Sequence, residues 1–160
     1  MRKLGSALVL SLLVLVAACG SSSKSNAGSS GDSGGSTLSK ADFIAQGDAI
    51  CKAVDAKAPK QPAGTDAKSL ADYLGGAIAP ISEASTKFAA LKAPSDATDL
   101  QKAFVADIDS AVTTLKAAKA KADAGDVPGA TSELQKATPG KDTTPKMAAY
   151  GFKDCADKGS

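Results

Sequence analysis

The sequence contains no histidine and no tryptophan, and aromatic residues make up only 4% of its 160 residues. Without histidine, the chain lacks the commonest general base and the commonest metal ligand of proteins. A Ser-His-Asp or Cys-His mechanism within this chain is therefore excluded. With so few aromatic residues, the core must be built mainly from Leu, Ile, Val and Ala, and such a core gains from an additional source of stability.

Arginine is almost absent as well, since Arg2 is the only one in the chain. The formal net charge is +2. If the chain is cut before Cys19, the loss of Arg2 and Lys3 lowers the number of basic residues from 19 to 17, which equals the number of acidic residues. Arginine is the preferred bidentate ligand of phosphate and guanine, so we do not expect the protein to bind nucleic acid.

Motifs for catalysis or metal binding are missing too. The sequence has no Gly-rich phosphate loop, no H-E-x-x-H and no G-x-S-x-G. Asp107 and Asp109 are two residues apart on a predicted helix, so their side chains point in different directions. The acidic residues around Gly125 are too few for a calcium loop. We expect no catalytic residue, no metal and no cofactor, and an enzyme using Asp, Lys or Tyr is the less favoured alternative.

The first 19 residues have the organisation of a targeting signal. Arg2 and Lys3 precede an apolar run from residue 4 to residue 16, which is shorter than the roughly 20 residues of a transmembrane helix and typical of a secretory signal. The run ends in Val16-Ala17-Ala18-Cys19, and here the chain resembles bacterial lipoproteins. Their lipobox is a branched apolar residue, two small residues and a cysteine.

This resemblance implies removal of residues 1–18 and attachment of a diacylglycerol to the sulfur of Cys19. Acyl chains of the palmitate type then hold the protein at the extracytoplasmic face of the cell membrane. Residues 20–37 are almost only Ser, Gly, Lys, Asn, Ala and Asp, and cannot offset their ordering entropy by burying apolar surface. We therefore interpret residues 19–37 as a lipid-anchored flexible tether with an average reach of about 25 Å. A glycosylated stalk is the alternative.

From Leu38 onward, apolar residues recur at steps of three and four, and no run alternates as a strand would. The pattern predicts an all-α domain over residues 38–160, a small antiparallel bundle of about four to five helices. The first helix starts at Ser39 and stops before Pro59, and the second runs from Asp66 to Pro94. A kink or break is expected near residues 76–80, because proline removes a backbone hydrogen bond.

Capping residues delimit the remaining helices. Ser95 or Asp96 is expected to cap the third helix, and Gly125 to end it. Asp126 then caps a short fourth helix, with Ala137 facing inward and a break at residues 139–140. Thr144 and Pro145 open a last helix that continues through Cys155.

Two cysteines remain once Cys19 is assigned to lipid. Outside the reducing cytosol, Cys51 and Cys155 are expected to form one disulfide between the first helix and the last. It would enclose about 105 residues and contribute about 4.7 kcal/mol in the chain-entropy model. The alternative is a redox pair or reactive thiol, which we disfavour because redox pairs usually have C-x-x-C spacing.

A second resemblance involves the neighbourhoods of these two cysteines. The segments ADFIAQGDAIC (41–51) and YGFKDC (150–155) resemble a group of small actinobacterial lipoproteins. These share a cysteine at the end of an ADxI-like helix and a late Y-G-aromatic/aliphatic-x-x-C segment. The resemblance implies a helical domain, supports the Cys51–Cys155 bridge, and implies no activity.

A ligand groove is predicted where glycines and a proline interrupt the second helix. Its residues are Tyr73, Gly75, Gly76, Pro80 and Tyr150, with the two phenol groups at its edge. The alternative is that each tyrosine belongs to the core with its hydroxyl at the rim. We expect a non-enzymatic module that binds an envelope protein or a small apolar ligand. A structural or accessory envelope protein without a small-molecule ligand is the second hypothesis.

Overall fold

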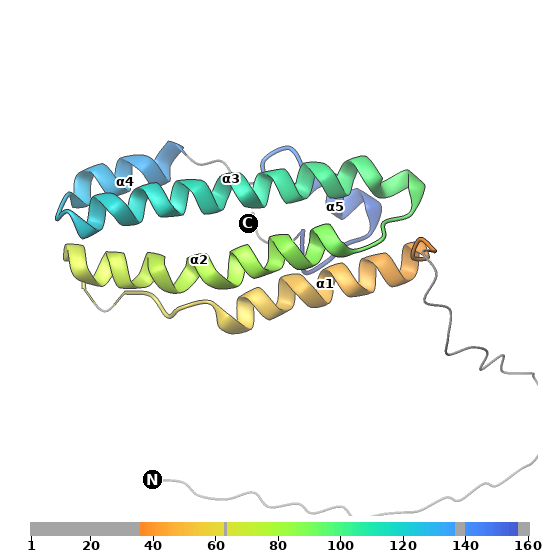
Figure 1. The fold of residues 1–160 in the computed structure, drawn as a ribbon, viewed down its shortest axis with the longest axis horizontal. Coiled ribbons are helices and arrows are strands. Elements are labelled where there is room, and N and C mark those ends of the chain that lie inside the picture. The colour runs from red at the N-terminus through yellow and green to blue at the C-terminus, as the bar shows by residue number, and fades with distance from the viewer. Residues whose placement is uncertain (1–35, 63, 137–139, 157–160) are drawn as a thin grey trace, which may run out of the picture. The chain divides into compact units, whose positions relative to one another are not determined.

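The computed structural model describes residues 36–62, 64–136 and 140–156. These residues form five α-helices and one 3₁₀ turn, with no strand among them (Figure 1). The elements are α1 (Lys40–Lys57), α2 (Ala67–Ala90), η1 (Ser95–Ala97), α3 (Thr98–Asp123), α4 (Val127–Lys136) and α5 (Thr144–Tyr150). The prediction of a small all-α bundle is confirmed. The predicted signal, the lipid site at Cys19 and the tether up to residue 35 lie outside the described residues.

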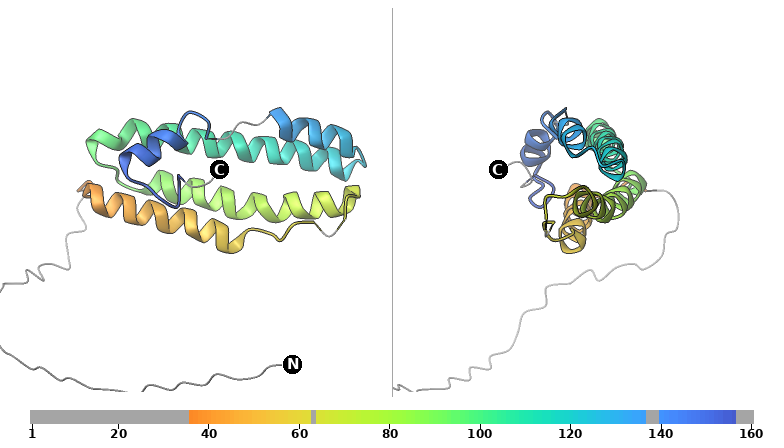
Figure 2. Two further views of the ribbon diagram at one scale, coloured as in Figure 1. Left: turned by 180° about the vertical axis from the view of Figure 1, so that it is seen from behind. Right: turned by 90° about the vertical axis from the view of Figure 1, so that its left-hand side faces the viewer.

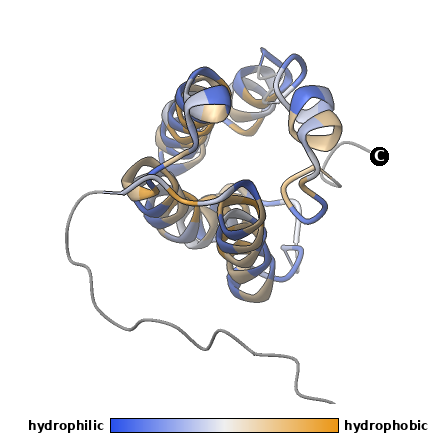
Figure 3. Ribbon diagram, turned by 90° about the vertical axis from the view of Figure 1, so that its right-hand side faces the viewer, coloured by the Kyte–Doolittle hydropathy of each residue, from blue (hydrophilic) through white to orange (hydrophobic). Residues whose placement is uncertain are grey.

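Successive helices run in opposite directions from α1 to α4 (Figure 1). The most extensive contact joins α2 to α3, and α4 packs against α3 next to the turn that connects them. The short α5 lies toward the other end of α3, near the start of α1, as the two further views also show (Figure 2). Figure 3 shows the same bundle end-on, coloured by hydropathy.

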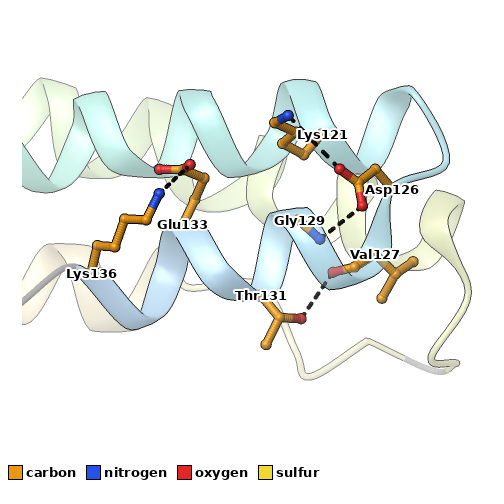
Figure 4. A network of polar contacts seen from close by, with 7 residues as sticks. All are labelled: Lys121, Asp126, Val127, Gly129, Thr131, Glu133 and Lys136. Carbon is orange, nitrogen blue, oxygen red and sulfur yellow. Dashed lines mark hydrogen bonds and ion pairs between the residues drawn. The ribbon is translucent and has the colours of Figure 1, made fainter.

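Three helix starts agree with the sequence-based prediction. The side chain of Ser39 accepts a hydrogen bond of 3.1 Å from the backbone N–H of Asp42, and Asp66 accepts one of 3.0 Å from Ser69. At the start of α4, the carboxylate of Asp126 accepts a 2.8 Å hydrogen bond from the N–H of Gly129 (Figure 4). Each of these side chains satisfies an N–H that has no partner within its own helix.

Of the kink or break expected near residues 76–80, the break does not occur, because α2 continues through Pro80. Its buried face includes Leu74 before the proline and Phe88 after it. Burying both sides of one continuous helix outweighs the roughly 3 kcal/mol that an internal proline costs. Tertiary packing therefore overrides the local signal.

The start of α3 also differs from the prediction. Ser95 and Asp96 lie in the 3₁₀ turn η1, and neither side chain accepts a capping hydrogen bond from α3, which begins only at Thr98. The N–H of Ala97 donates a 2.9 Å hydrogen bond to the carbonyl of Pro94, which closes the turn. This turn places Ala97 in the core, where it is fully buried.

The last helix ends at Tyr150 and does not reach Cys155. Gly151 has φ of +120°, a conformation that glycine adopts far more readily than other residues. The N–H of Phe152 donates back to the carbonyl of Met147, which seals the helix end. The chain then turns and buries Phe152 in the core. Cys155 therefore lies in a turn, while Ala137 and residue 139 lie outside the described residues.

The core consists of two clusters. The larger one contains all four phenylalanines of the chain, which pack mostly edge to face, together with Met147 and both cysteines of the bundle. The smaller one lies between α2, α3 and α4, and is formed by Leu74 and four alanines. Alanine side chains let these helices approach closely, whereas the four phenylalanines all lie in the part of the bundle that receives α5.

Candidate functional site

Cys51 and Cys155 form a disulfide, as the sequence predicts, with their Cα atoms 5.2 Å apart. The bond joins α1 to the turn after α5 rather than to the last helix itself. Both residues are buried, with exposed fractions of 7% and 3%. Reactive cysteines usually lie in partly exposed positions, so this environment favours the structural interpretation over the redox alternative.

The same turn is attached to α1 by a second interaction. Asp48 lies three residues before Cys51, and its carboxylate accepts hydrogen bonds from the backbone N–H groups of Lys153 at 3.1 Å and Cys155 at 3.2 Å. Gly47 allows the turn to come close, because a Cβ at this position would lie only 2.5 Å from Cε1 of Phe152. The helical spacing predicts Gly47 on the inward face of the first helix, together with Phe43, and Gly47 is indeed buried. No sequence pattern indicated the role of Asp48, although it lies in the segment that carries the second resemblance.

A hollow of about 250 Å³ lies directly beside the disulfide. Each of α1, α2 and α3 contributes lining residues that are spaced three or four apart, and thus lie on one face of their helix. The lining residues are Cys51, Val54, Ile81, Ala84, Phe104, Asp107, Ile108, Ala111, Gly140, Thr144 and Cys155. Most of them are apolar. We refer to this feature as the interhelical hollow.

Two polar side chains interrupt the apolar wall. Asp107 on α3 accepts a hydrogen bond through Oδ2 from the hydroxyl of Thr143, which is 4% exposed. Thr143 is the one hydrogen-bond partner of Asp107 within the described residues, and none of those residues donates to Oδ1. The hydroxyl of Thr144 belongs to the same wall. An apolar site with a few placed polar groups is typical of small-molecule binding.

The two-residue spacing of Asp107 and Asp109 predicts that their side chains point in different directions, and no further role was predicted for Asp107. That statement is confirmed, because Asp109 accepts instead from the hydroxyl of Ser85 on α2, at 2.6 Å. A signal for the role of Asp107 was present: it lies three residues after Phe104 and four before Ala111, within an apolar stripe.

The residues of the predicted groove have other environments. Gly75 and Gly76 serve close packing, since a Cβ would lie 3.1 Å from Cε of Lys119 at the first position and 3.3 Å from Cβ of Pro59 at the second. Pro80 lines a separate hollow of about 170 Å³ between α1 and α2. The space beside each glycine is thus occupied by a neighbouring side chain, and neither glycine opens a groove.

The two tyrosines belong to different parts of the bundle. Tyr73 packs against the Leu74 cluster, whereas Tyr150 packs against Phe43, which in turn contacts Phe88. Phe88 follows Tyr73 by 15 residues of α2, which corresponds to about 22 Å along the helix axis. The structure therefore does not bring Tyr73 and Tyr150 to the edge of one groove.

Tyr150 instead borders a shallow polar depression. Its hydroxyl donates to Asp96 at 3.1 Å, and the Nζ of Lys40 lies 4.2 Å from the centre of its ring. Partial burial, and then the hydrogen bond and charge of Asp96, raise the pKa of Tyr150 above its ordinary value. This depression has charges of both signs at its edge, including Asp99 and Lys146, and so differs from the apolar interhelical hollow.

In the part of the chain that the structure describes, no group of three or more Cys, Asp or Glu side chains is placed to hold a metal ion. No helix in that same part is long and apolar enough to cross a membrane. The chain matches no protein-family model, and its comparison with curated proteins and with solved structures gives no significant match. The interhelical hollow is therefore the candidate site, on geometry and chemistry alone.

Proposed function

We propose that this protein is a lipid-anchored binding module at the extracytoplasmic face of the cell membrane, and that it has no enzymatic activity. Its helical domain would hold a small apolar ligand in the interhelical hollow. The observation that supports ligand binding is this hollow, which three helices and the disulfide line with largely apolar side chains. The lipobox at Val16-Ala17-Ala18-Cys19 supports the anchor.

The size of the hollow limits the ligand. A volume of about 250 Å³ is slightly below the roughly 300–1,000 Å³ that small-molecule sites usually have. A slender chain or single ring fits this volume better than a drug-sized molecule. Moving apolar surface from water into such a site gains about 25 cal/mol per Å², so binding is expected to be driven by burial.

Ligand binding is tested with octan-1-ol as the probe, using calorimetry and methyl NMR of the purified chain. We expect saturable binding that shifts the methyl resonances of Ile81 and Ile108, both of which line the hollow. The variant Ala111→Leu adds volume at the wall and should weaken binding at least tenfold. Ala106→Leu is the matched control, because Ala106 lies on the same helix in an exposed position.

Two results would contradict the proposal. One is the absence of saturable binding by octan-1-ol. The other is equal binding to the wild-type protein and to Ala111→Leu, since the probe would then lie elsewhere. In either case, a structural or accessory role in the envelope becomes the better description of the domain.

The anchor is tested separately by the intact mass of the protein isolated from its native membranes. We expect a species that begins at Cys19, carries added acyl mass and gains two hydrogens on reduction of the Cys51–Cys155 bond. A freely secreted species without acyl mass would refute the anchor and leave ligand binding to be judged by the experiment above.

A further inference from the structure

We infer that the interhelical hollow selects apolar molecules that carry an ammonium group, and that it disfavours carboxylates of the same length. This inference rests on the proposed function, because it names the class of ligand for the same site. Its basis is the charge of the wall: Asp107 is the one charged residue among those that line the hollow.

The carboxylate of Asp107 is held in place. Thr143 is buried and donates its hydroxyl to Oδ2, which fixes the orientation of the side chain while Oδ1 accepts nothing within the described residues. An aspartate carboxylate only accepts hydrogen bonds, so a ligand group that reaches Oδ1 must be a donor. Charge-assisted hydrogen bonds are roughly twice as strong as neutral ones, and an ammonium group therefore fits better than a hydroxyl.

A carboxylate ligand would find no compensating charge in this hollow. Lys57 on α1 and Lys87 on α2 line the neighbouring 170 Å³ hollow, which shares Val54 and Ala84 with the interhelical hollow. Both are already paired with Glu83, at 2.9 Å and 2.6 Å. An anionic head placed beside Asp107 would thus meet like charge, which is unfavourable.

The position of Asp107 also implies an orientation for the ligand. On α3, Asp107 lies three residues after Phe104 and next to Ile108, while Val54 and Ile81 line the hollow from the other helices. The head group of the ligand would therefore lie beside α3 and the start of α5, at Asp107 and Thr144. The apolar chain would extend toward Val54 and Ile81.

The inference is tested with three probes of equal chain length: octylamine, octan-1-ol and octanoate. Binding to the full purified chain is measured at pH 7 by calorimetry. We expect octylamine to bind at least tenfold more tightly than octanoate, with octan-1-ol in between.

The variant Asp107→Asn retains the shape of the side chain and should weaken octylamine binding about tenfold, with a smaller change for octan-1-ol. Asp109→Asn is the matched control, since it removes the same charge two residues away and should leave the ranking unchanged.

A second measurement does not depend on a variant. In the complex of the wild-type protein with octylamine, we expect nuclear Overhauser contacts between the methylene next to nitrogen and the side chains of Asp107 and Thr144. Contacts of that methylene with Val54 instead would overturn the inference.

The outcomes separate the inference from the proposed function. Equal affinities for the three probes, or an unchanged affinity of octylamine in Asp107→Asn, would overturn the selectivity and leave apolar binding intact. Absence of binding by all three probes would refute the proposed function and the inference with it.

Discussion

The carboxylate of Asp48 accepts a 3.2 Å hydrogen bond from the backbone N–H of Cys155, so the disulfide partner of Cys51 is bound to α1 in two ways. Asp48 also accepts a hydrogen bond from the N–H of Lys153. The carboxylate of Asp48 therefore helps to position the turn after α5 independently of the disulfide. One wall of the interhelical hollow depends on this attachment, since Cys51 and Cys155 both line it.

Replacing Asp48 should destabilise the domain. In Asp48→Ala, the N–H groups of Lys153 and Cys155 lose their acceptor, and we expect a loss of about 1–3 kcal/mol in the free energy of unfolding. Urea denaturation measures it. Asp72→Ala is the control, because Asp72 forms only an exposed ion pair with Lys68 and should change stability by less than about 0.5 kcal/mol. Equal effects of the two substitutions would show that Asp48 does not hold the turn.

Removing the disulfide should have a larger effect. The sequence separation of Cys51 and Cys155 is 104, and closing a loop of that length contributes about 4.7 kcal/mol in the chain-entropy model. We expect the double variant Cys51→Ala/Cys155→Ala to lose about 3–5 kcal/mol. A reductant should lower the melting temperature of the wild-type protein and leave that of the double variant unchanged. A wild-type melting curve that does not respond to verified reduction would contradict this prediction.

Adding a single methyl group at Gly47 should also be costly. A Cβ there would lie 2.5 Å from Phe152 and 2.9 Å from Phe88, and overpacking of this kind costs about 1–3 kcal/mol. Gly75→Ala is the matched control in α2. Its Cβ would meet only the flexible end of Lys119, so helix propensity, worth up to about 1 kcal/mol, should leave this variant neutral or slightly more stable. Chemical denaturation measures the free energy of unfolding of both variants. A loss in Gly75→Ala as large as that in Gly47→Ala would contradict this prediction.

The ion pairs of Glu83 predict a dependence of stability on pH. Hydrogen bonds from Lys87 and Lys57, together with their charges, lower the pKa of Glu83 from 4.5 to about 2. A lowered pKa in the folded state stabilises the fold above the unfolded pKa, and this contribution is lost as pH falls from about 4.5 toward 2.

The measurement is the difference in melting temperature between the wild-type protein and Glu83→Gln as a function of pH. We expect a small constant difference at neutral pH that decreases below pH 4.5 and also decreases with added salt, because these side chains are exposed to solvent. A difference that stays constant down to pH 2 would show that the ion pairs do not contribute.

Sequence-based prediction succeeds for features that depend on neighbouring residues, and fails for features that depend on residues far apart in the sequence. Ser39, Asp66 and Asp126 were assigned correctly because a cap depends on residues two or three positions away. Pro80 does not break α2, contrary to one of the two expected outcomes, because its effect depends on packing along the whole helix. Asp107 acquires its role from Thr143, which is 36 residues away in sequence, and no local pattern indicates that α5 lies beside this part of α3.

The prediction of the ligand groove also depended on residues that are far apart in the sequence. Tyr73 and Tyr150 each have a neighbourhood that favours partial burial, and both are indeed half-buried. Which end of the bundle Tyr150 occupies depends on where α5 packs, and the turn after α5 is attached to α1 at Gly47, Asp48 and Cys51. The pairing of Cys51 with Cys155, by contrast, could be predicted by counting cysteines, because only these two remain once Cys19 is assigned to lipid.

The long separation of the bonded cysteines also has a consequence for biosynthesis. Cys51 leaves the ribosome well before its partner, which follows 104 residues later, so the correct bond cannot form until α2, α3, α4 and α5 have all been made. A chain interrupted before residue 155 lacks the partner of Cys51, so the formed bond is a mark of a chain that has been made through that residue.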